Sequence, residues 1–127
     1  MVEKRAYRLG DLQLQIMKVL WKDGSLSVAE VQQRLDGPPL AYTTVATMLR
    51  KMEGRGLVVH RQVDRRFVYE PRVSAEEVTR SMAGDLVDRL FEGSLAATVS
   101  HLLQTHEVSA GELERLERLI EEHKRRQ

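Results

Sequence analysis

A short run of small hydroxylated side chains is the part of this sequence best suited to chemistry. The run opens a predicted helix and begins two residues after the end of a Gly-Pro-Pro break. Threonine hydroxyls can hydrogen-bond phosphates or base edges, and threonine or alanine methyls can contact the methyl group of thymine. We therefore expect contacts to double-stranded DNA here, although a threonine pair can also be a plain helix cap and an aromatic side chain can lie at the edge of a core. The residues are Ala41, Tyr42, Thr43, Thr44 and Thr47.

Cationic side chains follow this run along the same helix and recur in two other segments, a polar turn and the N-terminal arm. Such groups bind DNA phosphates and supply affinity with little sequence information. Arginines in a hairpin turn are also common as solvated charges. The cations expected to contact DNA are Arg50, Lys51, Arg65, Arg66, Arg5 and Arg8, with Lys4 and Arg55 beside them.

The elements that must position these side chains can be derived from the residue pattern. Apolar residues spaced by three and four predict a helix from Leu9 to Trp21. Ser27 and Glu30 form a capping box that opens a second helix, and the third runs from Tyr42 to Arg55. Two β-rich runs, 57–61 and 66–70, then predict a hairpin. This order is typical of a winged helix-turn-helix, in which the second helix of the motif enters the major groove of DNA.

The remaining chain is predicted to be helical, with capping boxes at Ser74 and Ser109. We therefore expect a mainly α fold with a small β-hairpin wing, divided into a winged-helix domain, 1–73, and a helical dimerisation domain, 74–127. Residues 1–73 contain 13 Lys and Arg against 8 Asp and Glu, whereas residues 74–127 contain 7 against 11. This difference in charge indicates that the two halves bind different partners.

The helices of the second half have more apolar surface than a short appendage can bury. We predict a homodimer formed through these side chains; the alternative is that the helices fold back on their own domain. The predicted dimerisation residues are Val78, Met82, Leu86, Leu90, Leu95, Val99, Leu113, Leu116 and Ile120.

Several function classes are not expected for this sequence. It has no cysteine, which excludes disulfides, thiolate catalysis and thiolate metal sensing. No apolar run approaches the roughly 18 residues needed to cross a bilayer, and the charged N-terminus does not resemble a signal peptide. The histidines match no metal or catalytic motif. We therefore predict a cytoplasmic protein that is not an enzyme and uses no cofactor or metal.

Motifs along nearly the whole chain resemble those of the penicillinase-repressor family (BlaI, MecI and CopY type). They are more specific in the front half than in the back half. The residues that carry the resemblance are Leu9-Gly10-Asp11-Leu12 through Met17, Val19-Leu20-Trp21, Ala41-Tyr42-Thr43-Thr44-Val45, Gly56-Leu57-Val58 into Tyr69 and Pro71, Phe91-Glu92-Gly93-Ser94-Leu95, and Leu113 with Leu116.

This resemblance implies a repressor that binds inverted repeats with TACA/TGTA-like half-sites as a homodimer. In the antibiotic-resistance branch, a membrane metalloprotease-type sensor triggers cleavage at an Asn-Phe bond in the dimerisation helices. The corresponding bond here is His101–Leu102, a departure from that pattern. The copper-responsive branch uses a C-terminal cysteine motif, which this sequence lacks.

Two further function classes remain open at this point. One is a winged-helix adaptor that binds proteins, and the other is a regulator with a small-molecule pocket. The placement of Arg50, Lys51, Arg65 and Arg66 separates DNA binding from the adaptor. A shared face with the threonines favours DNA, whereas scattered positions favour the adaptor.

Overall fold

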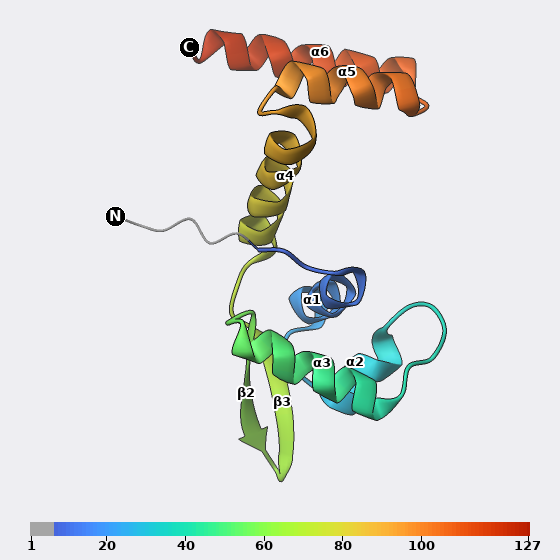
Figure 1. The fold of residues 1–127 in the computed structure, drawn as a ribbon, viewed down its shortest axis with the longest axis vertical. Helices are drawn as coiled ribbons and strands as arrows, with labels where there is room; N and C mark the ends of the chain where they lie inside the picture. Colours follow the sequence, from blue (N-terminus) through green and yellow to red (C-terminus); the bar gives the residue numbers. More distant parts are fainter. Residues whose placement is uncertain (1–6) are drawn as a thin grey trace. The chain divides into compact units, whose positions relative to one another are not determined.

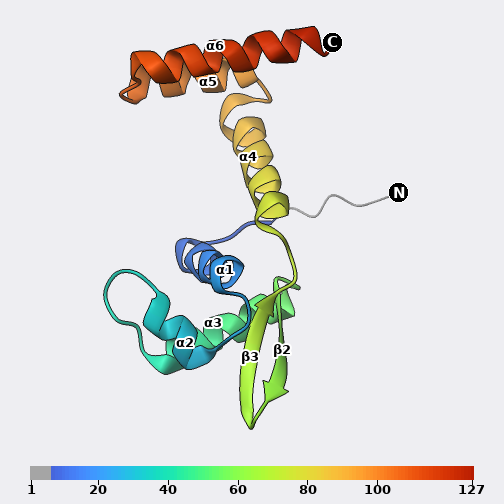
Figure 2. The same ribbon diagram turned by 180° about the vertical axis from the view of Figure 1, so that it is seen from behind.

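The computed structural model describes residues 7–127, which form six helices and three short strands. In chain order the elements are α1 (Asp11–Asp23), β1 (Leu26–Ser27), α2 (Val28–Arg34), α3 (Tyr42–Gly54), β2 (Val58–Val63), β3 (Arg66–Pro71), α4 (Ala75–Phe91), α5 (Leu95–Thr105) and α6 (Ala110–Arg125). Figures 1 and 2 show the hairpin of β2 and β3 beside α1, α2 and α3. The predicted fold class, mainly helical with a hairpin wing, is confirmed.

The three strands form one antiparallel sheet in the order β1-β3-β2. Sequence patterning predicted only the hairpin. In the structure, Val59 lies opposite Glu70 near the base of the hairpin and Val63 lies opposite Arg66 at its tip. The strand β1 was missed because it has only two residues, and the second of them, Ser27, is also the N-cap of α2. Leu26 and Ser27 pair with Tyr69 and Val68 of β3, so the sheet connects α2 to the wing.

Three predicted capping serines begin three helices. Ser27 accepts a hydrogen bond from the Glu30 amide, and the Glu30 carboxylate accepts one from the Ser27 amide at 3.0 Å. This backbone hydrogen bond lowers the pKa of Glu30 below its usual value because it favours the ionised carboxylate. Ser74 and Glu77 form the same reciprocal pair at α4, and Ser109 accepts from the Glu112 amide at α6.

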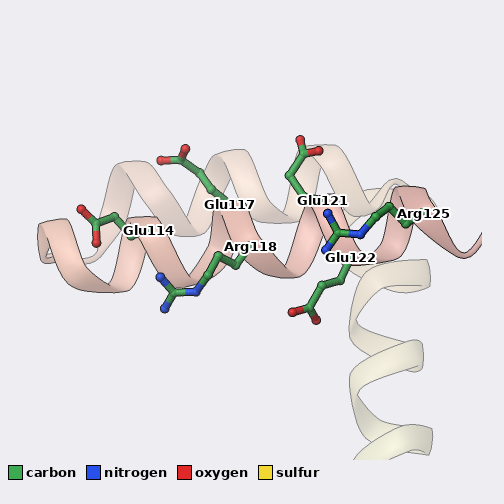
Figure 3. A pocket seen from close by; sticks show the side chains of 6 residues that line it. All are labelled: Glu114, Glu117, Arg118, Glu121, Glu122 and Arg125. Atoms are coloured by element: carbon green, nitrogen blue, oxygen red, sulfur yellow. The ribbon is translucent and has the colours of Figure 1, made fainter.

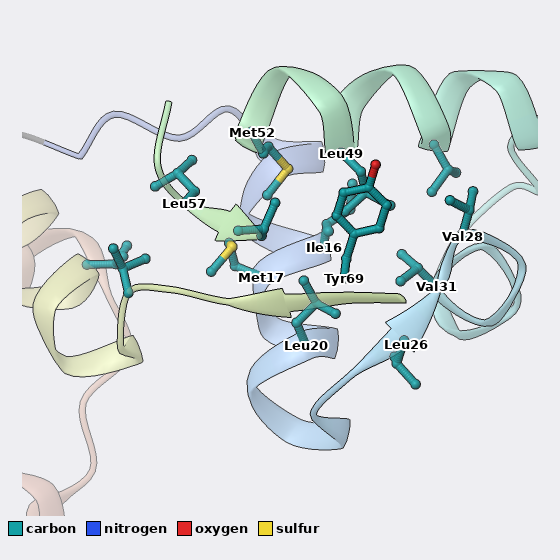
Figure 4. Packing of buried hydrophobic residues seen from close by; sticks show 14 residues of the cluster. Ile16, Met17, Leu20, Leu26, Val28, Val31, Leu49, Met52, Leu57 and Tyr69 are labelled. Carbon is teal, nitrogen blue, oxygen red and sulfur yellow. The ribbon is translucent and has the colours of Figure 1, made fainter. Parts of the chain in front are cut away.

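The hydrophobic core of the first unit lies where α1, α2 and α3 meet the sheet (Figure 4). Its fully buried side chains recur at helical spacing on each helix. Because one side of α3 is buried in this core, the other side of α3 faces solvent. The indole N–H of Trp21 donates to the carbonyl of Val73 at 2.8 Å and so joins α1 to the end of the sheet. The most deeply buried core residues are Ile16, Met17, Leu20, Val31, Val45, Leu49, Met52, Leu57, Val58 and Val78.

The chain divides into two compact units between Asp85 and Leu86, inside α4 and not at residue 73. The first turns of α4 belong to the winged-helix unit because Val78 is 1% exposed in its core and Met82 packs against that core. The Tyr7 amide also donates to the Ser81 hydroxyl at 2.9 Å. The prediction that Val78 forms a dimer contact is therefore wrong, since its side chain is buried within its own chain.

The second unit contains the end of α4 together with α5 and α6. A reversal at Glu92 and Gly93, both with positive φ, separates α4 from α5. The Ser94 hydroxyl then accepts from the Ala97 amide and begins α5. The ring of Phe91 lies 5.5 Å from that of His101. Within this unit only Thr98 is buried, so α5 and α6 have almost no core of their own.

Candidate nucleic-acid interface

The helix α3 exposes the predicted threonines along one side. Val45, Leu49 and Met52 are buried, whereas Thr43, Thr44 and Thr47 are exposed. The N-cap position belongs to Ala41, which has no capping side chain, and its carbonyl accepts from the amides of the third and fourth residues that follow. The threonines therefore belong to the first turns of the helix and do not cap it, and all three residues are exposed.

The cations of α3 lie on the same exposed side. Arg50 and Lys51 are both exposed, and the Arg50 guanidinium lies 3.5 Å from the Thr47 hydroxyl, one turn earlier. Arg55 differs, because its guanidinium donates to the Gln13 side chain at 2.9 Å and to the Arg8 carbonyl at 2.7 Å. These bonds join the segment before α1 to the end of α3, so Arg55 has a structural role that its sequence position did not reveal.

The hairpin tip presents Arg65 and Arg66 to solvent. A two-residue loop connects the strands, and its residues Asp64 and Arg65 have φ of 48° and 67°, as in a type I′ turn. Non-glycine residues adopt this left-handed conformation at some cost. The turn matches the twist of the two strands and fixes where the wing ends.

A groove of about 720 Å³ lies between α3, the start of α2 and the sheet. It brings together Tyr42, Thr43 and Arg50 of α3 with Arg65 and Arg66 of the wing, five of the predicted DNA-contact residues. Tyr42 is 53% exposed. Arg50 of the helix and Arg65 and Arg66 of the wing thus line a single groove, whereas Lys51 is not part of its lining.

The other predicted contact residues do not line this groove. Ala41 is exposed at the N-cap of α3, and Thr44, Thr47 and Lys51 are exposed on that helix. The side chain of Arg8 is exposed, and its carbonyl is held by Arg55. The predicted contact by Arg5 lies outside the described residues.

Several groove residues were not predicted as site residues, among them Glu53, His60, Phe67 and Tyr69. The Glu53 carboxylate accepts from the His60 amide at 3.1 Å and lies 2.6 Å from the His60 Nδ1 atom. The His60 ring contacts both Phe67 and Tyr69, and burial raises the pKa of the Tyr69 hydroxyl. The available signal in the sequence was the aromatic pair Phe67 and Tyr69 at alternate positions of 66–70. The contact between His60 and Glu53 had no such signal, because the two residues lie on different elements, seven residues apart across a turn.

The second unit has a largely apolar groove and a cluster of charged side chains on α6. A groove of about 730 Å³ is lined mainly by apolar residues of α5 and α6, together with charged residues that include Glu117 and Lys124. The charged side of α6 is shown in Figure 3, with Glu117, Glu121 and Arg118 among the residues drawn. Predicted dimer residues that line the groove are Leu95, Val99, Leu113, Leu116 and Ile120.

Other predicted positions of this unit are also exposed. Leu86 and Leu90 lie near the end of α4, with exposed fractions of 44% and 70%. The His101–Leu102 bond lies within α5, and both side chains are exposed.

Membrane-spanning helices and metal-binding clusters are both absent from residues 7–127. No helix there is long and apolar enough to span a bilayer. In the same range, no cluster of three or more His, Cys, Asp or Glu side chains could hold a metal ion.

Comparisons with known proteins place these features in one family. The profile of the penicillinase repressor family matches residues 9–122. The penicillinase repressor of Bacillus licheniformis is 29% identical over 124 residues, covering 97% of each chain. The transcriptional regulator BlaI of Mycobacterium tuberculosis is 34% identical over 121 residues, covering 91% of this chain and 84% of the relative.

A solved structure agrees with this assignment. The solution structure of the DNA-binding domain of the repressor BlaI has a TM-score of 0.50 and 30% identity, covering 59% of this chain and 93% of that domain. The relatives are transcriptional regulators and not enzymes, as predicted. The chain therefore belongs to the penicillinase repressor family and is a transcriptional repressor of the BlaI type with a winged-helix DNA-binding fold.

Proposed function

We propose that this repressor acts as a homodimer that binds an inverted-repeat operator in the cytoplasm. In each protomer, α3 enters the major groove, and Thr43, Thr44 and Thr47 contact base edges near its N-terminal end. The observation that carries this proposal is the groove lined by Arg50 of α3 and by Arg65 and Arg66 of the wing. That arrangement favours DNA over the adaptor function, because the cations and the threonines share one side of the domain.

Phosphate contacts supply the affinity in this proposal. Arg50 and Lys51 bind one stretch of the DNA backbone, and Arg65 and Arg66 bind the stretch below the wing. Arg5 and Arg8 of the N-terminal arm add cations to the same duplex. Ala41 and Tyr42 lie at the start of α3, where helix N-termini approach phosphates and base edges.

The dimer is proposed to form through the second unit. Its helices expose large apolar side chains, including Leu90 at 70%, Leu95 at 67% and Ile120 at 53%. Exposed apolar surface of this extent is typical of a protein–protein interface. A two-fold interface pairs the same surface on both protomers. Such a dimer carries two copies of α3, and we propose that both bind one duplex.

Induction is proposed to occur by cleavage of the His101–Leu102 bond under the control of a membrane metalloprotease-type sensor. The bond lies near the middle of α5, so a protease must open part of that helix before it can cut. Cleavage there separates α6 from the rest of the chain and removes half of the apolar groove. The dimer then dissociates while the winged-helix unit stays intact.

Operator specificity provides the test. The full chain is titrated into a fluorescent duplex with inverted TACA/TGTA half-sites and into a duplex of the same composition with the half-sites shuffled. Specific recognition predicts that the inverted repeat binds about a thousandfold or more tightly. Equal affinity for both duplexes contradicts the proposal.

A further inference from the structure

Three aromatic rings form a row on the groove side of the sheet. Tyr69 is 6% exposed and belongs to the core, whereas Phe67, two residues earlier on β3, is 55% exposed. His60 pairs with Tyr69 across the strands. Its ring lies 5.5 Å from that of Tyr69 and 5.0 Å from that of Phe67, with an edge-to-face angle of 85° to Phe67. The row thus extends from the core to an exposed phenyl ring.

This row is attached to the proposed recognition helix. Glu53 of α3 holds both the amide and the imidazole of His60. Phe67 therefore rests against a ring that is fixed at its backbone and its side chain. A side chain held in this way loses little rotamer freedom when a partner binds it.

The surroundings of Phe67 identify the chemistry of that partner. Arg50, Arg65 and Arg66 line the same groove as the exposed phenyl ring. A suitable partner therefore has anionic groups and an apolar patch between them. A DNA strand provides this alternation, since each deoxyribose lies between two phosphates, and phosphate and sugar atoms receive most protein–DNA contacts.

We propose that Phe67 packs against a deoxyribose of a DNA strand seated in this groove, with Glu53 and His60 as the pair that positions its ring. The inference rests on the proposed function, since it needs DNA bound to α3 and the wing. It adds an uncharged contact to the phosphate contacts of the arginines. Such a contact contributes affinity without releasing counterions, so its salt dependence differs from theirs.

The test compares Phe67→Ala and Phe67→Tyr with the wild-type chain on the inverted-repeat duplex at several salt concentrations. We expect Phe67→Ala to bind about tenfold more weakly, with an unchanged slope of log affinity against log salt. Phe67→Tyr keeps the ring and should remain within about twofold of wild type. The matched control Gln62→Ala changes the residue opposite Phe67 on β2, outside the groove lining, and should also bind within about twofold of wild type.

Hydroxyl-radical footprinting locates the contact, because the radicals attack exposed deoxyribose. Phe67→Ala should lose protection at the sugars below the wing and keep it at the sugars beside α3. A folded Phe67→Ala chain with wild-type affinity and footprint overturns this inference and leaves the proposed function intact. A wild-type chain that does not distinguish the inverted repeat from the shuffled duplex overturns the proposed function, and the Phe67 contact with it.

Discussion

The Glu53 carboxylate of α3 lies 2.6 Å from the Nδ1 atom of His60 on β2 and also accepts the His60 backbone N–H. This pair links α3, which is proposed to read DNA bases, to the wing, which is proposed to bind the DNA phosphate backbone. The two side chains are 27% and 39% exposed, so solvent weakens their attraction. The pair therefore matters more for the position of the wing than for overall stability.

A double-mutant cycle of Glu53→Ala and His60→Ala measures this coupling. We expect a coupling free energy of about 0.5–1.5 kcal/mol in urea unfolding, as for one hydrogen-bonded pair that is partly exposed. Each single variant should also weaken operator binding, because the wing loses its attachment to α3. Strictly additive effects on unfolding would show that the pair does not stabilise the wing.

Substitution of the exposed threonines tests base reading. Thr44→Ala and Thr47→Ala should each cost about 1–3 kcal/mol in operator binding, since phosphate contacts cannot replace a missing base contact. Binding to random DNA should change little. The measurement is a competition titration of each variant with operator and random duplexes, and equal losses on both would exclude a base-reading role.

The wing arginines are expected to act through charge. Replacement of Arg65 and Arg66 by alanine should weaken binding to every duplex and lower the salt slope by about 0.9 for each phosphate that is no longer neutralised. Arg72→Ala is the matched control, since this exposed arginine follows the sheet and lies outside the groove lining. An unchanged slope in the double variant would identify Arg65 and Arg66 as solvated turn charges.

The second unit is tested by Leu116→Asp, which places a charge in the apolar groove of α5 and α6. Burying that charge at an interface is costly, so sedimentation should show monomers. These monomers should keep weak half-site binding but lose most operator affinity, because the second half-site is no longer held at high effective concentration. Arg118→Asp on the charged side of α6 (Figure 3) is the control and should stay dimeric. Leu116→Asp chains that remain dimeric would exclude this interface.

Local patterns in the sequence predicted much of the fold, because those patterns act over a few residues. Ser27, Ser74 and Ser109 begin helices as predicted, since a capping bond spans only three residues. The family resemblance and the winged-helix class were also evident in the sequence. The strand β1 has too few residues to produce an alternating pattern, so it could not be predicted.

Features of the site that depend on contacts between distant segments could not be predicted from the sequence. Val78 shares a helical spacing with Met82 and Leu90, and that periodicity cannot show that α4 passes from one compact unit into the next. The contact between Glu53 and His60 likewise depends on the turn from α3 into β2. The groove residue Phe67 was identified only after the fold placed it beside Arg50 and Arg66.

In the proposed function, two copies of this chain bind one inverted repeat. The most direct measurement is sedimentation of the full chain with a duplex carrying two inverted half-sites and with a duplex carrying one. We expect two chains on the inverted repeat, bound at least about a hundredfold more tightly than the single half-site. One chain per duplex, with the same affinity for both duplexes, would contradict it.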